Sequence, residues 1–191
     1  MSRLKRLSRV GRLRGLQALP NLSGHKKRSE KARIQEGRLP TLGDTDNFIN
    51  DVARLYGDRA LAGRIAELKK QFPGATVPEL VVYDWLRWRN IPFDYQVAMF
   101  GGWGQKGGLV PDFVLMGDYV GRALQIQGDY WHGNVRKQGQ DMATKMRLLG
   151  SFWNGHQITS VTNIWEINLK NPATRNKTLD MALAGVEMPG A

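Results

Sequence analysis

Cysteine is absent from the 191 residues of the chain. This absence excludes disulfide bonds, thiolate ligands for zinc and a cysteine nucleophile, and it gives no reason to expect an oxidising compartment. A run of 18 apolar residues is also absent, so we expect no membrane-spanning helix. A cytoplasmic or virus-associated protein fits these absences, and an organellar transit peptide in the Arg-rich N-terminus is the less favoured alternative.

Acidic residues are scarce in the first 40 residues, which hold 12 Lys and Arg but only 2 Asp and Glu. The rest of the chain holds 16 basic and 15 acidic residues, so nearly all of the net charge of +11 lies in this first segment. A basic segment beside a nearly neutral domain is typical of proteins that contact a phosphate backbone, because each neutralised phosphate releases a counterion. We therefore predict a nucleic-acid partner, with a larger assembly through the basic segment as a further expectation. A solvated tail that aids solubility is the plainer alternative.

The pattern of apolar residues divides the chain into an arm and one domain. Glycine and proline recur through residues 1–43, which predicts a basic arm that is ordered mainly by its partner. Between residues 44 and 73 apolar side chains repeat every three or four positions and predict one or two amphipathic helices that end at Pro73-Gly74. Thr76 and Glu79 form a capping-box pattern before a helix that ends ahead of Pro92. We predict a single domain over residues 44–191, with its core at 76–170.

A period of two follows Pro92. Residues 93–99, 109–116 and 120–127 predict three strands, joined by the glycine-rich stretch 101–108 and by a tight turn at Gly117-Asp118. Residues 140–153 predict a helix with Met142, Met146 and Leu149 on its inner side, and residues 158–169 predict a fourth strand parallel to an earlier one. The last helix begins at Asn171-Pro172 and ends at Gly185. The predicted fold class is α/β, in the α+β sense of a mixed sheet of about four strands flanked by helices.

The six tryptophans and the lysines near the strands carry further expectations. One tryptophan, Trp103, lies in the glycine-rich turn and is predicted to be exposed enough to stack on a base. The others are predicted to be mostly core residues, namely Trp85, Trp88, Trp131, Trp153 and Trp165. The predicted nucleic-acid contacts come from the arm, the glycine-rich turn and the helix after residue 140, at Arg3, Lys5, Arg6, Arg9, Arg12, Arg14, Lys26, Lys27, Arg28, Lys106 and Lys145.

Five ionisable side chains stand out as candidates for chemistry: Glu79, Asp112, His132, Asp141 and Glu166. Asp112 lies in the middle of an apolar strand, where a carboxylate is costly unless a cation, a hydrogen bond or an ion pair compensates it. His132 follows two aromatic residues where a strand passes into a loop, and an imidazole there accepts a proton from water near neutral pH. Carboxylate, cation, water and histidine together predict hydrolysis of phosphodiesters. Glu166 is interpreted as structural.

The segments that carry these residues resemble the PD-(D/E)XK nuclease superfamily, and in particular its very-short-patch-repair-like endonuclease branch. The resemblance lies in "VPDFVL" (110–115), "IQGDYWHGN" (126–134), "DMATKMRLLG" (141–150) and "NIWEINL" (163–169), within residues 76–170. Gly128, Trp131 and His132 match the glycine, tryptophan and histidine of that branch in order and spacing. The implied fold is a restriction-endonuclease-like core, and the implied substrate is DNA rather than RNA.

By this resemblance Asp112 is the metal-binding aspartate and Glu79 the supporting carboxylate of the preceding helix. His132 is the general base that activates water, and Asp141 is the acidic partner that orients it. The implied cofactor is Mg²⁺, or Mn²⁺ in its place, and both are hard cations suited to oxygen ligands. The structural zinc site of the branch is not carried over, because its cysteines have no counterpart here.

The second signature of the superfamily is an acidic residue, any residue and then lysine, and here these positions are Gln125-Ile126-Gln127. The branch resembled also lacks that pair, and a backbone carbonyl serves there as a metal ligand. The Ile126 carbonyl and the amide oxygen of Gln125 are therefore the predicted further ligands, with lower affinity than a carboxylate gives. The alternative function is a catalytically degenerate nuclease fold that binds nucleic acid or is a structural component of a virion or ribonucleoprotein.

Each site residue also has a structural alternative. Glu79 is explained equally by capping its helix, and Asp112 by a buried salt bridge. His132 has the alternative of a hydrogen-bonded core histidine, and Asp141 that of a carboxylate favourable to a helix N-terminus. The positions of these four side chains distinguish the functional interpretation from the structural one.

Overall fold

A computed structural model of the protein describes residues 42–102, 108–128 and 135–189, without the side chains of residues 42, 43, 135–138, 140 and 141. The described residues belong to one compact unit, Leu39–Ala191. Residues 1–41 of the predicted arm lie outside them, so the arm and its boundary at residue 43 stay predictions. No helix in the described ranges is both long and apolar enough to cross a membrane.

The unit begins with a pair of helices, α2 (Leu42–Tyr56) and α3 (Arg59–Gln71). Asp58 caps α3, since its side-chain Oδ1 accepts a hydrogen bond from the backbone N–H of Leu61 at 2.9 Å. The helix ends at Phe72, directly before Pro73-Gly74. The predicted pair of amphipathic helices is therefore confirmed.

The next helix, α4 (Val77–Trp88), brings Glu79 to the sheet. Thr76 is its N-cap, and the Thr76 Oγ1 accepts from the backbone N–H of Glu79 at 3.4 Å, as the capping box predicts. The inner face of α4 is formed by the side chains of Leu80, Val81, Trp85 and Leu86, which are all buried. Trp88 is 73% exposed, so its prediction as a core residue was wrong.

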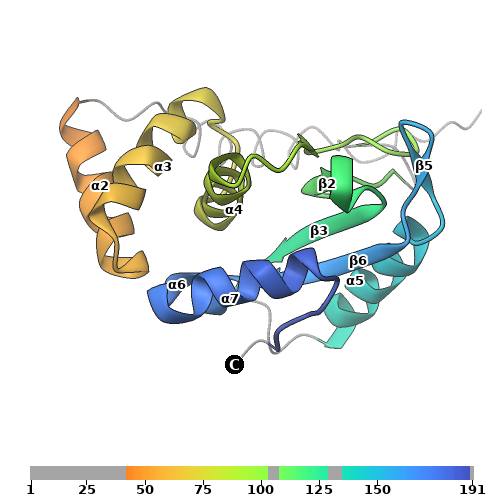
Figure 1. The fold of residues 1–191 in the computed structure, drawn as a ribbon. Coiled ribbons are helices and arrows are strands. Elements are labelled where there is room, and N and C mark those ends of the chain that lie inside the picture. Colours follow the sequence, from red (N-terminus) through yellow and green to blue (C-terminus); the bar gives the residue numbers. More distant parts are fainter. Residues whose placement is uncertain (1–41, 103–107, 129–134, 190–191) are drawn as a thin grey trace, which may run out of the picture. The chain divides into compact units, whose positions relative to one another are not determined.

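Four strands form the central sheet in the order β1-β2-β3-β6 (Figure 1). These are β1 (Phe93–Tyr95), β2 (Phe113–Leu115), β3 (Arg122–Gln127) and β6 (Ser160–Trp165). The pairs β1-β2 and β2-β3 are antiparallel, whereas β3 and β6 are parallel. Both features were predicted, and the mixed sheet flanked by helices is confirmed at this level.

All four strands of the sheet are shorter than the sequence pattern suggests. β1 ends at Tyr95 because Gln96 has a φ of 51°, which turns the chain out of the extended conformation. Beyond it only an isolated bridge joins Met99 to Leu109, and the second strand proper starts at Phe113. The fourth strand ends at Trp165, where Glu166 begins the short helix α6 (Glu166–Lys170), so the prediction of a strand to residue 169 was wrong.

The crossover from β3 to β6 contains helix α5 (Val135–Leu148). Of the three residues predicted on its inner side, Leu149 packs against a hydrophobic core, whereas the prediction was wrong for Met142 and Met146. Met142 and Met146 are 61% and 63% exposed, whereas Leu148 is fully buried. The helix stops near Gly150, whose φ of 83° is left-handed, rather than running on to residue 153. A small hairpin follows it, with β4 (Phe152–Trp153) paired to β5 (His156–Gln157). Each of these two strands has only two residues, which is too few to give an alternating pattern of apolar and polar residues in the sequence.

The sheet separates two hydrophobic cores, because side chains alternate along each strand. Phe113, Leu115 and Leu124 belong to the larger core, which contains residues of α2, α3, α4, α6 and α7. Val114 and Ala123, their neighbours along the strands, belong to the smaller core together with Leu148 of α5. The face of the sheet to which each strand residue of the candidate site points therefore follows from the core that its neighbours along the strand belong to.

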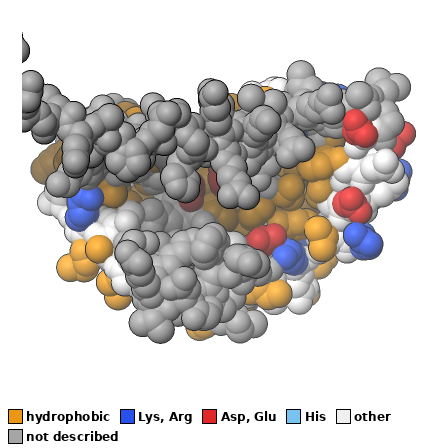
Figure 2. All heavy atoms as spheres, turned by 180° about the vertical axis from the view of Figure 1, so that it is seen from behind, with side chains coloured by type: hydrophobic (Ala, Val, Ile, Leu, Met, Phe, Trp, Pro, Cys, Tyr) orange, Lys and Arg blue, Asp and Glu red, His pale blue; other side chains and the backbone are white. Residues whose placement is uncertain are grey.

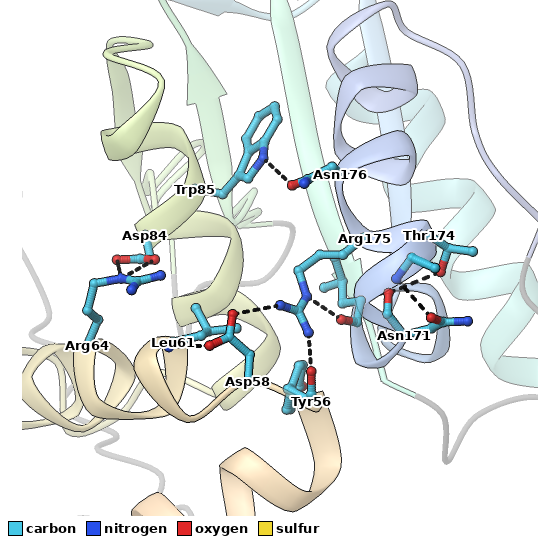
Figure 3. Close-up of polar contacts among 12 residues, drawn as sticks. Tyr56, Asp58, Leu61, Arg64, Asp84, Trp85, Asn171, Thr174, Arg175 and Asn176 are labelled. Carbon is cyan, nitrogen blue, oxygen red and sulfur yellow. Dashed lines mark hydrogen bonds and ion pairs between the residues drawn. The ribbon is translucent and has the colours of Figure 1, made fainter.

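The last helix, α7 (Pro172–Leu183), is tied to the first helices by a buried arginine (Figure 3). Asn171 caps it as predicted, since its Oδ1 accepts from the N–H of Ala173 at 2.9 Å. The Arg175 guanidinium donates to the carbonyl oxygens of Leu169, at 2.7 Å, and of Tyr56. Arg175 therefore connects α2, α6 and α7 through hydrogen bonds to backbone carbonyls.

Candidate active site

Asp112 lies at a bend directly before β2, and not in the middle of a longer strand as predicted. The backbone pairing of Phe113 with Leu124 places Asp112 beside the end of β3. Its Oδ2 accepts a hydrogen bond from the backbone N–H of Ile126 at 2.7 Å. No ion pair of Asp112 occurs within the described residues, so this polar contact replaces the buried salt bridge that was the structural alternative.

Burial raises the pKa of Asp112 to about 7, because the ionised carboxylate is poorly solvated there. The hydrogen bond from Ile126 acts in the opposite direction, and the charge of Glu79 raises the pKa further. The carboxyl group therefore exchanges its proton close to neutral pH. A cation that binds at this position would replace that proton, and such a perturbed acid is a functional-site candidate.

Glu79 faces the same region from the first turn of α4, and its carboxylate is held by three donors. The Thr76 hydroxyl donates to Oε1 at 2.7 Å. Oε2 accepts from the Tyr95 hydroxyl at 2.6 Å and from the Gln96 side-chain amide at 3.1 Å. The helix-capping reading explains only the first of these contacts, so the structure places Glu79 in a network that reaches from α4 to the end of β1.

Tyr95 and Gln96 are site residues that the sequence reasoning missed. Burial raises the pKa of the Tyr95 hydroxyl, as do its hydrogen bond to Glu79 and the charges of Glu79 and Asp112. Tyr95 therefore stays a hydrogen-bond donor near neutral pH. A signal was present in the sequence, because a tyrosine on the buried face of a strand needs a partner for its hydroxyl.

The Gln125-Ile126-Gln127 segment forms the end of β3, as predicted. Gln125 pairs in register with Asn163 of β6, and Gln127 donates from its side-chain nitrogen to Asn163 Oδ1 at 3.4 Å. Gln125 and Gln127 have the same parity as Ala123 and so point to the face of the smaller core. The Ile126 backbone contacts Asp112 through its N–H, and the metal-ligand roles of its carbonyl and of Gln125 stay predictions.

His132, Trp131, Trp103, Lys106 and the predicted arm contacts lie outside the described residues. Asp141 lies within α5, in its second turn and not at its start as predicted, and its side chain is outside the described part. Lys145 forms an ion pair with Glu187, with 3.1 Å between Nζ and Oε2. Glu166 has the structural role assigned to it, since it forms an ion pair with Lys170 at 3.2 Å.

The described residues therefore bring together Asp112, Glu79 and the end of β3. They contain no cluster of three or more His, Cys, Asp or Glu side chains arranged to hold a metal ion. The face in Figure 2 carries acidic and basic side chains among hydrophobic ones, and its coloured residues form no broad basic surface. This matches the near-neutral charge of the chain after residue 40.

A groove of about 490 Å³ between α3, α4 and α7 lies apart from these residues. Its charged groups are largely paired with one another: Arg64 Nε donates to both carboxylate oxygens of Asp84, at 3.1 and 3.0 Å (Figure 3). The guanidinium of Arg175 lies 3.7 Å from the Asp58 carboxylate on the same groove. This pairing identifies the groove as part of the helix packing, so the candidate site stays at Asp112.

Comparison of the chain with models of protein families, with curated proteins and with solved structures finds no match.

Proposed function

We propose that the protein is a metal-dependent endonuclease of the PD-(D/E)XK type that hydrolyses phosphodiester bonds in DNA. The observation that carries the proposal is the position of Asp112. This half-buried acid follows Pro111 at the start of a strand, and it accepts a hydrogen bond from the Ile126 N–H of the next strand at 2.7 Å. The charge of Glu79 raises the pKa of Asp112 further. An ionised carboxylate held in this way lowers the stability of the folded chain, and a bound cation would offset that loss.

The chain order supports the proposal. The elements run α4, β1, β2, β3, α5 and β6, and the four strands make one mixed sheet with helices on both faces. This is the arrangement implied by the resemblance of residues 76–170 to the superfamily. The contacts of Glu79 on α4 and of Asp112 before β2, with Gln125 in register on β3, support the proposal that these residues form the site.

The proposed chemistry divides among these residues. Asp112, the Gln125 amide oxygen and the Ile126 carbonyl oxygen would hold Mg²⁺ or Mn²⁺, which would supply electrostatic stabilisation of the charge on the reacting phosphate. His132 takes the proton of the attacking water, and Asp141 orients the imidazole. The twelve basic residues of the first 40 contact the DNA backbone and hold the duplex.

A second candidate function is supported by the two glutamines on β3. Gln125 and Gln127 replace the acid and the lysine of the second signature, so the end of the strand carries no formal charge. A fold with weakened cation binding would act as a nucleic-acid-binding or structural component of a virion or ribonucleoprotein. In this second function the basic arm still binds nucleic acid, but no phosphodiester bond is hydrolysed.

Supercoiled plasmid distinguishes the two functions. The protein is incubated with plasmid and either Mg²⁺ or Mn²⁺, beside the variants His132→Ala and Asp112→Asn. His156→Ala and Asp118→Asn are the matched controls, because both side chains are exposed and lie outside the site. Nicking that needs the cation, His132 and Asp112 supports the endonuclease. Plasmid binding without nicking in any of these conditions rejects it and supports the second function.

A further inference from the structure

Gln96 is bonded to both acidic residues of the candidate site. Its backbone N–H donates to the carbonyl oxygen of Asp112 at 2.8 Å, and its side-chain Nε2 donates to Oε2 of Glu79 at 3.1 Å. We infer that Gln96 is a positioning residue that fixes the Glu79 carboxylate relative to Asp112 and so preorganises the cation site. This inference rests on the proposed function, since it assigns a role within the same site.

The backbone of Gln96 supports this assignment. Its φ of 51° is in the left-handed region, which glutamine adopts less readily than glycine or asparagine. In a regular strand the side chains of Tyr95 and Gln96 would point to opposite faces of the sheet. The left-handed turn instead brings the Gln96 amide to 2.9 Å from the Tyr95 hydroxyl, with both donating to one oxygen of Glu79. The unfavourable conformation thus has a defined consequence at the site.

Tyr95 is the second residue, beside Gln96, that positions the Glu79 carboxylate. Its ring is enclosed by the rings of Phe72, Tyr83 and Phe113, with centroids 5.5, 5.6 and 5.1 Å away. The hydroxyl therefore has little freedom to leave Glu79, which it contacts at 2.6 Å. An aromatic cluster and a left-handed turn together fix one carboxylate oxygen from two directions.

The contacts also define how Glu79 can act. An ionised carboxylate has about four acceptor sites on its two oxygens. Three are taken by Thr76 at 2.7 Å, Tyr95 at 2.6 Å and Gln96 at 3.1 Å, so both sites of Oε2 are filled and one site of Oε1 is left. Glu79 can then accept one donor more, such as a water bound to the cation held by Asp112. It acts as an outer-sphere partner that orients the site rather than as a bidentate ligand.

The test measures Mn²⁺ binding to the full chain by isothermal titration calorimetry, with Mn²⁺ as the only ligand. Gln96→Gly removes the amide and also relieves the left-handed φ, so a loss of binding cannot be attributed to a failure to fold. Asn154→Gly is the matched control. Asn154 also has a left-handed φ, of 47°, and its amide also donates to a carboxylate, Asp94, at 3.1 Å. Asp112→Asn defines the binding that belongs to the site.

The inference predicts that Gln96→Gly binds Mn²⁺ more weakly than the unmodified chain, by a factor of up to about ten, because Gln96 acts on the cation only through the outer-sphere Glu79. Tyr95→Phe shifts the affinity in the same direction, and Asn154→Gly leaves it unchanged. The thermal midpoint of Gln96→Gly without metal is equal to or above that of the unmodified chain. Its nicking of plasmid, reduced at low Mn²⁺, recovers at saturating Mn²⁺, which a general structural defect would not allow.

Equal Mn²⁺ affinity in Gln96→Gly and the unmodified chain would overturn the inference and leave the proposed function intact. An equal loss of affinity in Gln96→Gly and Asn154→Gly would overturn it too, because the effect would then be a general loosening. If the unmodified chain shows no binding that Asp112→Asn removes, the cation site itself fails. The proposed function and the inference are then both rejected.

Discussion

The side chain of Asp112 and the backbone of Ile126 join two strands of the sheet through a hydrogen bond of 2.7 Å from the Ile126 N–H to Oδ2. This is one of the few polar contacts that a buried acid can make without an ion pair. It partly offsets the cost of burial, yet the pKa of Asp112 still rises to about 7. The site therefore holds a carboxyl group whose protonation changes near neutral pH.

The raised pKa predicts a pH-dependent stability that Asp112 causes. The folded chain holds the Asp112 proton up to about pH 7, whereas the unfolded chain releases it near the ordinary value of 3.8. The folded state therefore binds more protons between these pH values, and its stability falls as the pH rises through them. The loss is at most roughly 1.4 kcal/mol for each pH unit in that window.

Asp112→Asn removes this titration and keeps an oxygen that accepts from Ile126. In metal-free buffer the variant should unfold at a higher urea concentration than the unmodified chain at pH 8, and the two should converge near pH 4. Asp118→Asn, at an exposed position, should follow the unmodified chain. Parallel pH profiles for Asp112→Asn and the unmodified chain would show that Asp112 is not the group that titrates.

Binding of a divalent cation should offset the free-energy cost of the ionised Asp112 carboxylate. Ligand that binds only the folded state stabilises it by about 2.7 kcal/mol at a hundredfold excess over its Kd. Mg²⁺ or Mn²⁺ should therefore raise the unfolding midpoint of the unmodified chain at pH 8, and chelation should lower it again. The midpoint of Asp112→Asn should not respond, and a response equal to that of the unmodified chain would place the bound ion elsewhere.

Arg175 should be among the most sensitive positions of the helical layer (Figure 3). Arg175→Leu leaves the carbonyl oxygens of Tyr56 and Leu169 without their donor, in a position where the arginine side chain is only 10% exposed. Unsatisfied buried acceptors cost about 1–3 kcal/mol each, so the variant should lose about 2–6 kcal/mol in urea unfolding. Arg54→Ala removes an exposed ion pair and should change stability by less than about 1 kcal/mol.

Deletion of residues 1–40 should remove most of the salt dependence of DNA binding. The segment holds 12 of the 28 basic residues, and the slope of log K against log salt is about −0.9 for each phosphate neutralised. Fluorescence anisotropy with a labelled duplex at several salt concentrations measures this slope. The circular dichroism of the deleted chain should retain its folded signal. An unchanged slope would remove the arm from the account.

The sequence predicted the elements whose signals are local. The Thr76 cap, the stop at Pro73-Gly74 and the Asn171 cap each depend on a few adjacent residues, and all three were predicted correctly. The parallel pairing of the last strand with an earlier one followed from connection rules, because a helix lies between β3 and β6. Asp112 and Glu79 were identified as a pair from residue type and resemblance.

The rest depends on tertiary contacts that a linear pattern does not contain. Met142 and Met146 are apolar at helical spacing, yet α5 packs through Leu148, so the residue type alone misassigned the face. The left-handed Gln96 shortened β1, and neither its conformation nor its bond to Glu79 has a signal in the chain. The role of Gln96 follows only from the positions of β1, α4 and Asp112 in the folded chain.

The position of a bound cation tests the account most directly. Crystals of the protein soaked in Mn²⁺ give an anomalous difference map in which the ion is located independently of any assay. The account predicts a peak about 2.0–2.6 Å from an Asp112 carboxylate oxygen, the range of hard-cation bonds to oxygen, with the Glu79 carboxylate one water away. An ion found only at other residues, with Asp112 bonded solely to the Ile126 N–H, would contradict it.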